Sequence, residues 1–395
     1  MSDDPFLRGR LTLRRSGRTV RYLAPHSVFA SHAIDHGTLL LLDHLPPGEP
    51  ASFLDLGSGY GVLGLEIAAR FPRARGLLVD RDLLAVEFSK RNAELLGGSS
   101  VQVAPSLGYR DLPPGSAPFD WILSNVPARA GERVLGAFIS GGLARLRPGG
   151  EMRIVVIAPL SPSVERAAAD AGIGFRLAAR SQSHSVYSFP TVGAGAPRTV
   201  RDFGGGEEVY ERDCVRLALP EDLRLVRPSD LADEPGRLQA AIPLLAEHLP
   251  ALSGARVLVF RAGYGLLPAL ALARCPDSTV TAMDRDLLAS AFVEKNCRES
   301  GAGLRVEERL RISDPPPLGP FDLVLGELSP PLGPRATLVE LGEARDALAP
   351  GGRGLVLALA KQWKEFLDSA SASLGIRVLA RRDPAVLLEL RARTP

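Results

Sequence analysis

The stretch "FLDLGSGYGVLG", residues 53–64, combines an acid with closely spaced glycines. An apolar run reaches Asp55, and three glycines follow it, Gly57, Gly59 and Gly61. Glycines directly after a strand permit a tight turn and let backbone N–H groups approach a ligand closely. The segment "GYGVLG" also satisfies the G-x-G-x-x-G pattern of dinucleotide-binding turns, which alone is a weak signal. A strand-to-helix turn without a ligand is the structural alternative.

The acid that precedes the glycines distinguishes between the ligands. A carboxylate at Asp55 would repel a pyrophosphate, whereas it can pair with an ammonium group. Asp80 ends the next apolar run, "GLLVD", where it is placed to accept hydrogen bonds from ribose hydroxyls. A ligand with an amino-acid end, a ribose and no phosphate fits these groups best. We therefore expect S-adenosylmethionine as the cofactor.

Alternating apolar runs predict the elements that position these residues. Four short runs read as strands: "SFLDL", "GLLVD", "DWILSN" and "MRIVVIA". Helical patterns lie between them, in "GVLGLEIAARF", "LLAVEFSKRNAELL" and "ERVLGAFISGGLARL". Strands that alternate with helices predict parallel βαβ units and a doubly wound α/β sheet. Ligands of such sheets bind at the carboxyl ends of the strands, where Asp55, Asp80 and Asn125 all fall.

The sequence contains an internal duplication. "DRDLLA" occurs at residues 80–85 and again, unchanged, at 284–289. "GYG" occurs in both halves at the same offset, and "LRPGG" at 146–150 has its counterpart "LAPGG" at 348–352. We therefore expect two tandem Rossmann-like domains of one origin.

The duplication and the composition together give the expected domain boundaries. The Gly- and Pro-containing stretch "TVGAGAPRTVRDFGGGEE" reads as the linker between the copies. The expected parts are a basic N-terminal arm at 1–21, a cofactor-binding catalytic domain at 22–190, the linker at 191–208 and a degenerate second domain at 209–395.

The second copy has lost the residues that would bind the ligand. Val259 replaces Asp55, and Arg261 stands in place of Gly57. An arginine there would fill the expected amino-acid site and repel its ammonium group. Asp284 survives, and alone it is interpreted as an acid at a helix N-terminus. This copy is expected to be inactive and to serve substrate docking or stability.

The first copy resembles a known group of enzymes. "FLDLGSGYGVLG", "LLVDRD", "FDWILSNVPA" and "LRPGGEMRIVV" resemble the successive motifs of class I S-adenosylmethionine-dependent methyltransferases. The upstream "SVFASHAIDHGTLLLLDHLP" resembles the lead-in of the "small" methyltransferase domain of ribosomal small-subunit (16S) guanine-N2 methyltransferases. Those proteins also have two tandem domains, one of them decayed, although usually the first. The resemblance covers about residues 20–190 well and 245–390 weakly.

The resemblance implies roles for individual cofactor residues. The turn with Asp55, Gly57, Gly59 and Gly61 would hold the methionine part, and Asp80 the ribose. Ser106 and Leu107 stand where many relatives have an acid that binds the adenine amino group. No metal is expected to take part.

The tetrapeptide "NVPA", residues 125–128, matches the Asn-Pro-Pro-Phe motif of the family and supplies the expected catalytic residues, Asn125 and Pro127. An asparagine carbonyl there accepts a hydrogen bond from the target amino group. This contact directs the lone pair of the amino nitrogen at the methyl group. Ala128 replaces the aromatic residue that would stack on a flipped base. Another side chain would have to supply that stacking, and the sequence does not identify it.

The sequence therefore predicts an N-methyltransferase whose N-terminal domain modifies an exocyclic amino group of an RNA base. The first candidate for that group is N2 of a guanine in rRNA. One alternative is a methyltransferase of a protein side chain or a small molecule, which would account for the missing aromatic residue. Another is a non-catalytic RNA-binding or scaffold protein descended from a methyltransferase.

Charge and composition indicate the partners and the compartment. The net charge is only +2, yet residues 8–21, "RGRLTLRRSGRTVR", hold six arginines and no acid. Such an arm can contact the phosphates of RNA, although a solvated hairpin turning at Ser16–Gly17 explains it too. No apolar run approaches the ~20 residues of a membrane span, and the N-terminus has no secretory pattern. Three scattered cysteines form no metal motif, so a cytoplasmic protein is expected.

The lead-in segment before "LLLLDHL" leaves alternatives open. Phe29, Asp35 and Thr38 lie in a stretch that resembles the family's cofactor-covering segment. A packing phenylalanine and a helix cap would explain them equally well. His32 and His36 have the i, i+4 spacing of metal ligands, but a surface or packing role is the better interpretation because no third ligand is evident.

Overall fold

The computed structural model describes residues 4–97, 100–191, 206–217, 222–231, 241–298, 303–328, 332–361, 363 and 374–392. The chain divides into two compact units: Leu7–Glu211, and Arg212–Pro395 together with Met1–Phe6. Most of the expected linker, residues 192–205, lies outside the described part of the chain.

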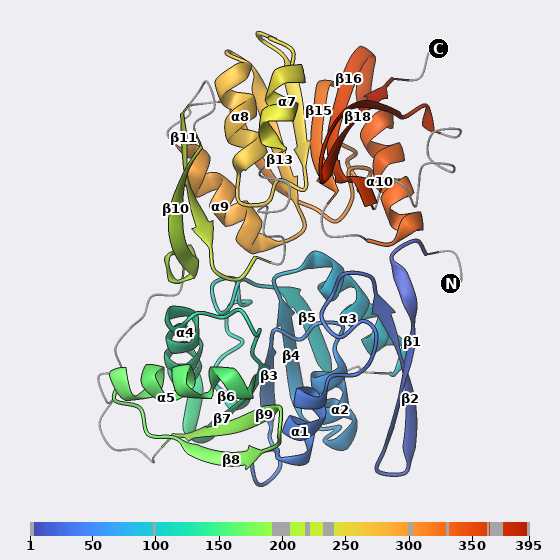
Figure 1. The fold of residues 1–395 in the computed structure, drawn as a ribbon. Helices are drawn as coiled ribbons and strands as arrows, with labels where there is room; N and C mark the ends of the chain where they lie inside the picture. The colour runs from blue at the N-terminus through green and yellow to red at the C-terminus, as the bar shows by residue number, and fades with distance from the viewer. Residues whose placement is uncertain are drawn as a thin grey trace. The chain divides into compact units, whose positions relative to one another are not determined.

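A seven-stranded sheet forms the centre of the N-terminal unit, in the order β5-β4-β3-β6-β7-β9-β8 (Figure 1). Its strands are β3 (Ser52–Leu56), β4 (Arg75–Asp80), β5 (Val101–Pro105), β6 (Phe119–Asn125), β7 (Leu146–Ile157), β8 (Arg176–Arg180) and β9 (His184–Pro190). Strands β3 to β7 pair in parallel, and β9 pairs antiparallel with β7 and β8. The predicted doubly wound α/β sheet is confirmed, with an antiparallel pair added at one edge.

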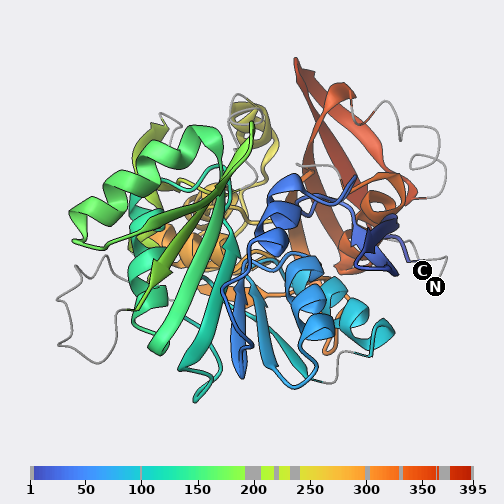
Figure 2. The ribbon, with the colours of Figure 1, turned by 90° about the horizontal axis from the view of Figure 1, so that it is seen from below.

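Helices cover both faces of this sheet (Figure 2). They are α1 (His36–Asp43), α2 (Val62–Arg70), α3 (Leu83–Leu95), α4 (Glu132–Leu143) and α5 (Ser161–Asp170), with short 3-10 turns at Ala158–Leu160 and Glu207–Tyr210. Figure 2 shows α1 to α3 over one face, and α4 with α5 over the other. The central strand β3 is buried on both faces, and all five of its residues are buried.

The arginine-rich segment forms an antiparallel hairpin of β1 (Leu7–Arg15) and β2 (Arg18–Pro25). It turns at Ser16 and Gly17, which have positive φ of 48° and 73°, as predicted from the sequence. Asn92 of α3 fixes the second strand, since its side chain exchanges hydrogen bonds with the backbone of Leu23 at 2.8 and 3.0 Å. The hairpin is therefore an integral part of the N-terminal unit.

The C-terminal unit repeats this plan. Its sheet has the order β14-β13-β12-β15-β16-β18-β17. The strands are β12 (Arg256–Phe260), β13 (Thr279–Asp284), β14 (Leu304–Glu308), β15 (Phe321–Leu328), β16 (Leu348–Leu359), β17 (Arg377–Arg382) and β18 (Ala385–Arg391). The helices are α7 (Ile242–His248), α8 (Leu266–Arg274), α9 (Leu287–Cys297) and α10 (Pro334–Asp346). The expected duplication of the fold is confirmed.

The duplication extends further towards the N-terminus of each unit than the sequence motifs indicate. A hairpin of β10 (Glu211–Leu217) and β11 (Leu223–Pro228) precedes the second sheet, as β1 and β2 precede the first. Asn296 of α9 exchanges hydrogen bonds with the backbone of Val226 at 2.8 and 2.9 Å, as Asn92 does with Leu23. The same clamp therefore joins hairpin and helix in both units.

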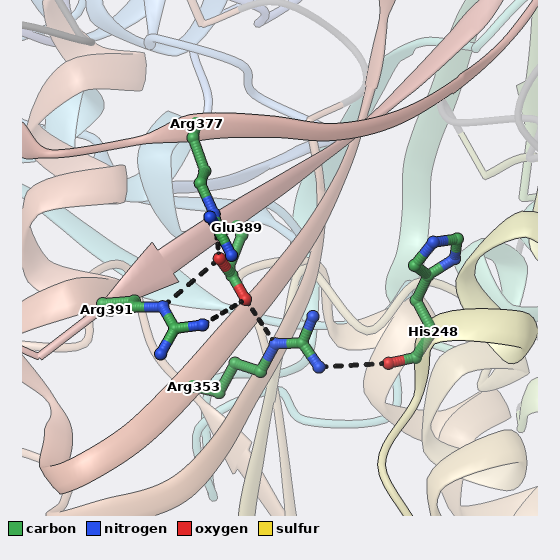
Figure 3. Close-up of polar contacts among 5 residues, drawn as sticks. All are labelled: His248, Arg353, Arg377, Glu389 and Arg391. Atoms are coloured by element: carbon green, nitrogen blue, oxygen red, sulfur yellow. Dashed lines mark hydrogen bonds and ion pairs between the residues drawn. The ribbon is translucent and has the colours of Figure 1, made fainter.

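Three arginines surround one buried glutamate in the second sheet (Figure 3). Glu389 of β18 is fully buried and pairs with Arg353, Arg377 and Arg391. Burial opposes the charge of this carboxyl, but its bonds to the arginines prevail and lower its pKa. Arg353 also donates to the carbonyl oxygen of His248 at 3.4 Å, which secures the end of α7. The cluster therefore has a structural role.

Candidate active site

The glycine turn joins β3 to α2 and leaves open space above its first two glycines. Gly57, Gly59 and Gly61 all have positive φ, of 76°, 56° and 95°. A Cβ atom at Gly57 or Gly59 would meet nothing within 4 Å, whereas one at Gly61 would lie 2.7 Å from Ser89 Oγ. The first two glycines thus offer a surface that a ligand can approach, and the third permits close packing against α3.

Asp55 lies beneath this turn and is only 1% exposed. Its Oδ2 accepts a hydrogen bond from the backbone N–H of Gly64 at 2.8 Å. Burial raises the pKa of Asp55 to about 7; the bond from Gly64 opposes this shift and the charge of Asp80 adds to it. Residue 64 has no room for a side chain, since a Cβ there would lie 2.6 Å from Leu78 Cδ1. Asp55 therefore positions the first turn of α2 and holds a carboxyl group that a cation would ionise.

Asp80 ends β4 and also holds the turn. Its Oδ2 accepts from the N–H of Gly59 at 2.8 Å, and its Oδ1 accepts from the N–H of Asp82 at 2.9 Å. Burial raises the pKa of Asp80 to about 6, against the effect of both bonds. Each carboxylate oxygen has a second lone pair, so these bonds are compatible with acceptance from a ligand hydroxyl.

Ser58 contributes a polar atom that the sequence analysis did not single out. Its hydroxyl is buried in the glycine turn and has no hydrogen-bond partner among the described residues. A buried hydroxyl of this kind usually has a partner, and a bound ligand would supply one. The buried carboxyl, the orphan hydroxyl and the open glycines together fit the methionine part of S-adenosylmethionine.

Asn125 ends β6 with its side-chain amide in a fixed orientation. Its Nδ2 donates to Asp35 Oδ2 at 2.7 Å and to Thr38 Oγ1 at 3.0 Å. A carboxylate accepts only, so the NH2 group must face Asp35. The carbonyl oxygen of Asn125 consequently points away from these two partners, as an acceptor for another donor.

Asp35 serves two elements at once. It is the N-cap of α1, where its Oδ2 accepts from the N–H of Thr38 at 3.0 Å. The same oxygen accepts from Asn125, which is 90 residues further along the chain. The helix cap, which the sequence left open as one of two alternatives, is thus present, and Asp35 also joins the lead-in segment to the end of β6.

Comparison with known proteins identifies the family. Residues 19–170 and 235–368 match the model of the family described as "Methyltransferase small domain". The chain belongs to this family. The predicted enzyme class, an S-adenosylmethionine-dependent methyltransferase, is thereby confirmed.

Individual relatives match one part of this methyltransferase. The protein YbxB of Bacillus subtilis, which is uncharacterized, is 31% identical over 146 residues, 37% of this chain and 72% of its own length. The ribosomal RNA small subunit methyltransferase C of Hahella chejuensis is 33% identical over 141 residues, 35% of this chain and 40% of its own length. The ribosomal RNA large subunit methyltransferase G of Streptomyces coelicolor is 35% identical over 150 residues, 36% of this chain and 38% of its own. This chain therefore spans about two fifths of the length of the ribosomal RNA methyltransferases that it matches.

A solved structure matches both units together. It is the T. thermophilus 16S rRNA N2 G1207 methyltransferase (RsmC) in complex with AdoMet and guanosine. The match has a TM-score of 0.69 at 18% identity and covers 98% of this chain and 99% of that chain. The tandem arrangement of two methyltransferase folds is thus shared with a known protein.

The remaining predicted site residues of the methyltransferase shape loops at the strand ends. Pro127 is exposed, and its carbonyl oxygen accepts from the N–H of Ala130 at 3.0 Å, so a turn begins two residues after Asn125. Ser106 and Leu107 are buried after β5. The Ser106 hydroxyl donates to the carbonyl oxygen of Gly108 at 2.9 Å, and the N–H of Leu107 donates to Asp111 Oδ2 at 2.9 Å. The carboxylate of Asp111 thus lies beside Leu107, close to the position where many relatives have an acid.

The two histidines do not share a helix face. His36 begins α1, whereas His32 lies in the preceding loop and forms a 2.9 Å hydrogen bond with Arg8. In the part of the chain that the structure describes, no three His, Cys, Asp or Glu side chains gather as metal ligands would. Nor does any described helix have the length and apolarity needed to cross a membrane.

The second copy of the site lacks both the carboxylate acceptor that Asp55 supplies in the first copy and the N–H donor that Gly64 supplies there. Val259 stands where Asp55 stands, and Pro268, at the same offset from Gly64, has no N–H to donate. Ala282 replaces Leu78, so the bulk gained at Pro268 is lost from its neighbour. An acid at position 259 would be left without its N–H donor, and a proline at 268 would clash with a leucine at 282. With Val259, Pro268 and Ala282 together, this site becomes part of an apolar core.

Arg261 fills the second turn and is neutralised there. It has a positive φ of 50° in place of Gly57, and its guanidinium pairs with Glu340 of α10 at 2.7 Å. Glu340 takes the place of Phe138 at the offset that aligns the two "PGG" segments. The ion pair therefore occupies two positions that hold Gly57 and Phe138 in the first copy, and it joins the turn to α10.

Asp284 keeps the bonds of Asp80 in this altered site. It accepts from the N–H groups of Gly263 and Asp286 at 2.9 and 3.0 Å. The cap of α9 is Asp286, so the interpretation of Asp284 as the acid at that helix terminus is wrong. Asp284 survives because it holds the backbone of the turn, which the second unit still needs.

Proposed function

We propose that the N-terminal unit transfers a methyl group from S-adenosylmethionine to the exocyclic amino group of an RNA base, and that this base is a guanine of ribosomal RNA methylated at N2. The observation that carries this proposal is the fixed amide of Asn125, whose carbonyl oxygen is left to accept from an amino group. Two of the relatives named above are ribosomal RNA methyltransferases, one of the small and one of the large subunit, which supports an RNA substrate.

Asn125 acts by positioning and by charge. Its carbonyl oxygen accepts one N–H of the target amine, which holds the nitrogen in line for attack. As the new N–C bond forms, the bond between that carbon and the donor sulfur would break, and the amine becomes positively charged until it loses a proton to solvent. A carbonyl dipole directed at the amine stabilises that charge. Pro127, two residues further along the chain, begins the turn that leads the chain away from Asn125.

The residues of the glycine turn bind the cofactor. When bound, S-adenosylmethionine supplies an electrophilic methyl group. Asp55 provides the negative charge for the methionine ammonium, Ser58 provides a hydroxyl for its polar end, and Asp80 accepts from the ribose. Gly57 and Gly59 leave the space that the ligand needs. Ser106 and Leu107 shape the loop beside the adenine.

The C-terminal unit is proposed to be inactive as a methyltransferase. The support is the concerted loss of Asp55, Ser58 and the Gly64 N–H at Val259, Ala262 and Pro268, together with the Arg261–Glu340 pair. Arg261 would place a like charge against the methionine ammonium. This unit is left to dock the substrate or to stabilise its partner domain, and the protein is proposed to act in the cytoplasm.

Label transfer tests this function. The purified protein is incubated with methyl-labelled S-adenosylmethionine and ribosomal subunits, deproteinised RNA or soluble protein extract, all taken from cells that lack this protein. We expect label in RNA, in a guanine after nuclease digestion, and none with Asn125→Ala. Label in the protein extract alone would overturn the RNA proposal and favour a protein substrate, which would accord with the missing aromatic residue at Ala128.

A further inference from the structure

An exposed aromatic side chain lies in the segment that carries Asp35. Phe29 is 67% exposed, so the alternative that it packs in the core is wrong. Among the described residues, the other large aromatic with more than a third of its surface exposed is Phe175, and its ring packs against Tyr187 and Phe189. One exposed aromatic ring is common on protein surfaces, so a binding role for Phe29 is inferred from where it lies relative to the active site and not from its exposure alone.

Two hydrogen bonds hold the segment of residues 26–35 against the active site. At one point, the hydroxyl of Tyr60, in the glycine turn, donates to the carbonyl oxygen of Ala30 at 3.0 Å. At the other, Asp35 accepts from Asn125. Phe29 is the neighbour of Ala30, so its backbone is fixed one residue from the contact with the cofactor turn.

The backbone around Phe29 is strained. Ser27 and Ala30 have positive φ of 54° and 58°, which side chains other than glycine rarely adopt. Such conformations cost energy, so they occur where contacts with the surrounding structure stabilise them, and they are frequent at ligand sites. Here they lie on either side of Phe29, two residues before it and one residue after it.

The proposed reaction needs an aromatic surface that the tetrapeptide lacks. A base that leaves its stack loses stacking energy, which enzymes restore with an aromatic side chain in the pocket. Ala128 is exposed and has no ring to offer. A cationic group contacts the same segment: Arg8 of β1 is hydrogen-bonded to His32, and His32 is three residues from Phe29 in the chain. A guanidinium there suits the phosphates that flank a base.

We propose that Phe29 stacks on the target base and so performs the task of the aromatic residue missing at position 128. The proposal rests on the proposed function, because it assumes a base as substrate. It makes Phe29 a substrate-contacting residue whose loss weakens RNA binding and leaves cofactor binding unchanged.

Fluorescence distinguishes base stacking from a contact with the cofactor. Phe29→Trp places an indole at the site, while Trp121 and Trp363 are buried and give a constant background. With saturating S-adenosylhomocysteine present, we expect guanosine to quench this variant. Phe175→Trp, the matched control at an exposed ring beside β8, should not respond. Quenching by S-adenosylhomocysteine alone, or no quenching by guanosine, would overturn the proposal.

Kinetics test the same residue in the complete reaction. Stacking of a base on an aromatic ring corresponds to about 5- to 160-fold in binding, so Phe29→Ala should raise KM for RNA by such a factor. Phe29→Tyr should behave as wild type and Phe29→Leu as Phe29→Ala, because only the ring stacks. Adding Ala128→Phe to Phe29→Ala should recover part of the loss.

The outcomes separate this inference from the function on which it rests. A wild-type protein that methylates RNA together with a fully active Phe29→Ala would overturn the role of Phe29 alone. A wild-type protein that methylates no RNA would overturn the proposed function, and the guanosine titration would still decide whether Phe29 binds a base.

Discussion

At the scale of single residues, the carboxyl group of Asp55 links cofactor affinity to pH. Its pKa is about 7 in the protein without ligand, because burial disfavours the charge. A bound ammonium favours the ionised form and lowers this pKa, so binding below pH 7 must release a proton. The Kd for S-adenosylmethionine should therefore fall about tenfold per pH unit up to pH 7 and level off above it. Calorimetry from pH 5.5 to 8.5 measures this.

Asp55→Asn is the control for this titration. It keeps an acceptor for the N–H of Gly64 but has no charge to titrate. We expect weaker binding whose pH dependence near 7 is lost. A wild-type affinity that stays level between pH 5.5 and 7 would show that Asp55 does not pair with the ammonium.

Asp35 and Asn125 act as one unit, so their variants should share a signature. Asn125→Ala should lower kcat about 100-fold or more, the usual cost of losing such a stabilising group, with the Kd for cofactor unchanged. Asp35→Ser keeps an oxygen that can cap α1 but does not reach Asn125 as the carboxylate does, so kcat should fall by a smaller factor. Rates at saturating RNA and cofactor titrations give both quantities. Full activity of Asp35→Ser would mean that Asp35 only caps the helix.

At the scale of elements, the strand ends were predictable because apolar runs determine where β3, β4 and β6 stop. The hairpin turn at Ser16–Gly17 was predictable for a similar local reason. The bond between Asp35 and Asn125 was not, because it joins residues 90 positions apart and depends on how α1 meets β6. The exposure of Phe29 was not predictable either, because the hydrophobicity of a phenylalanine favours a buried position and only the packing of the folded chain shows otherwise. Ser58 had one signal, its replacement by Ala262 in the second copy.

The turn between β12 and α8 in the C-terminal unit allows a test of whether the cofactor site there can be restored by one substitution. Val259→Asp restores the lost acid in β12, yet Pro268 offers no N–H and Arg261 still pairs with Glu340. We expect no gain of cofactor binding and a loss of stability of about 3 kcal/mol or more, because the carboxyl is buried without a donor. Thermal unfolding and calorimetry measure the two effects. Binding of a second cofactor molecule by this variant would contradict this explanation.

At the scale of the whole molecule, the arginine hairpin should contribute to RNA affinity through its charge. Arg10, Arg14 and Arg21 are exposed on β1 and β2, whereas Arg15 pairs with Asp43 at 2.6 Å. Replacing these three by Gln should weaken RNA binding at low salt and reduce the slope of log K against log salt by about 2. Cofactor binding should be unchanged. An unaltered slope would mean that the hairpin is merely a solvated edge.

The duplication supplies a matched pair of aspartates that decides how many working sites the chain has. Asp80 and Asp284 make equivalent bonds to their own turns, with lengths that agree within 0.1 Å. Burial raises the pKa of each to about 6. Replacing either by Ala removes the same backbone contacts, so the two variants should lose similar stability in their own units. Asp80→Ala alone should abolish cofactor binding, and wild-type protein should bind one S-adenosylmethionine per chain. Equal losses of binding from both variants, or two molecules bound per chain, would show that the second unit has kept its site.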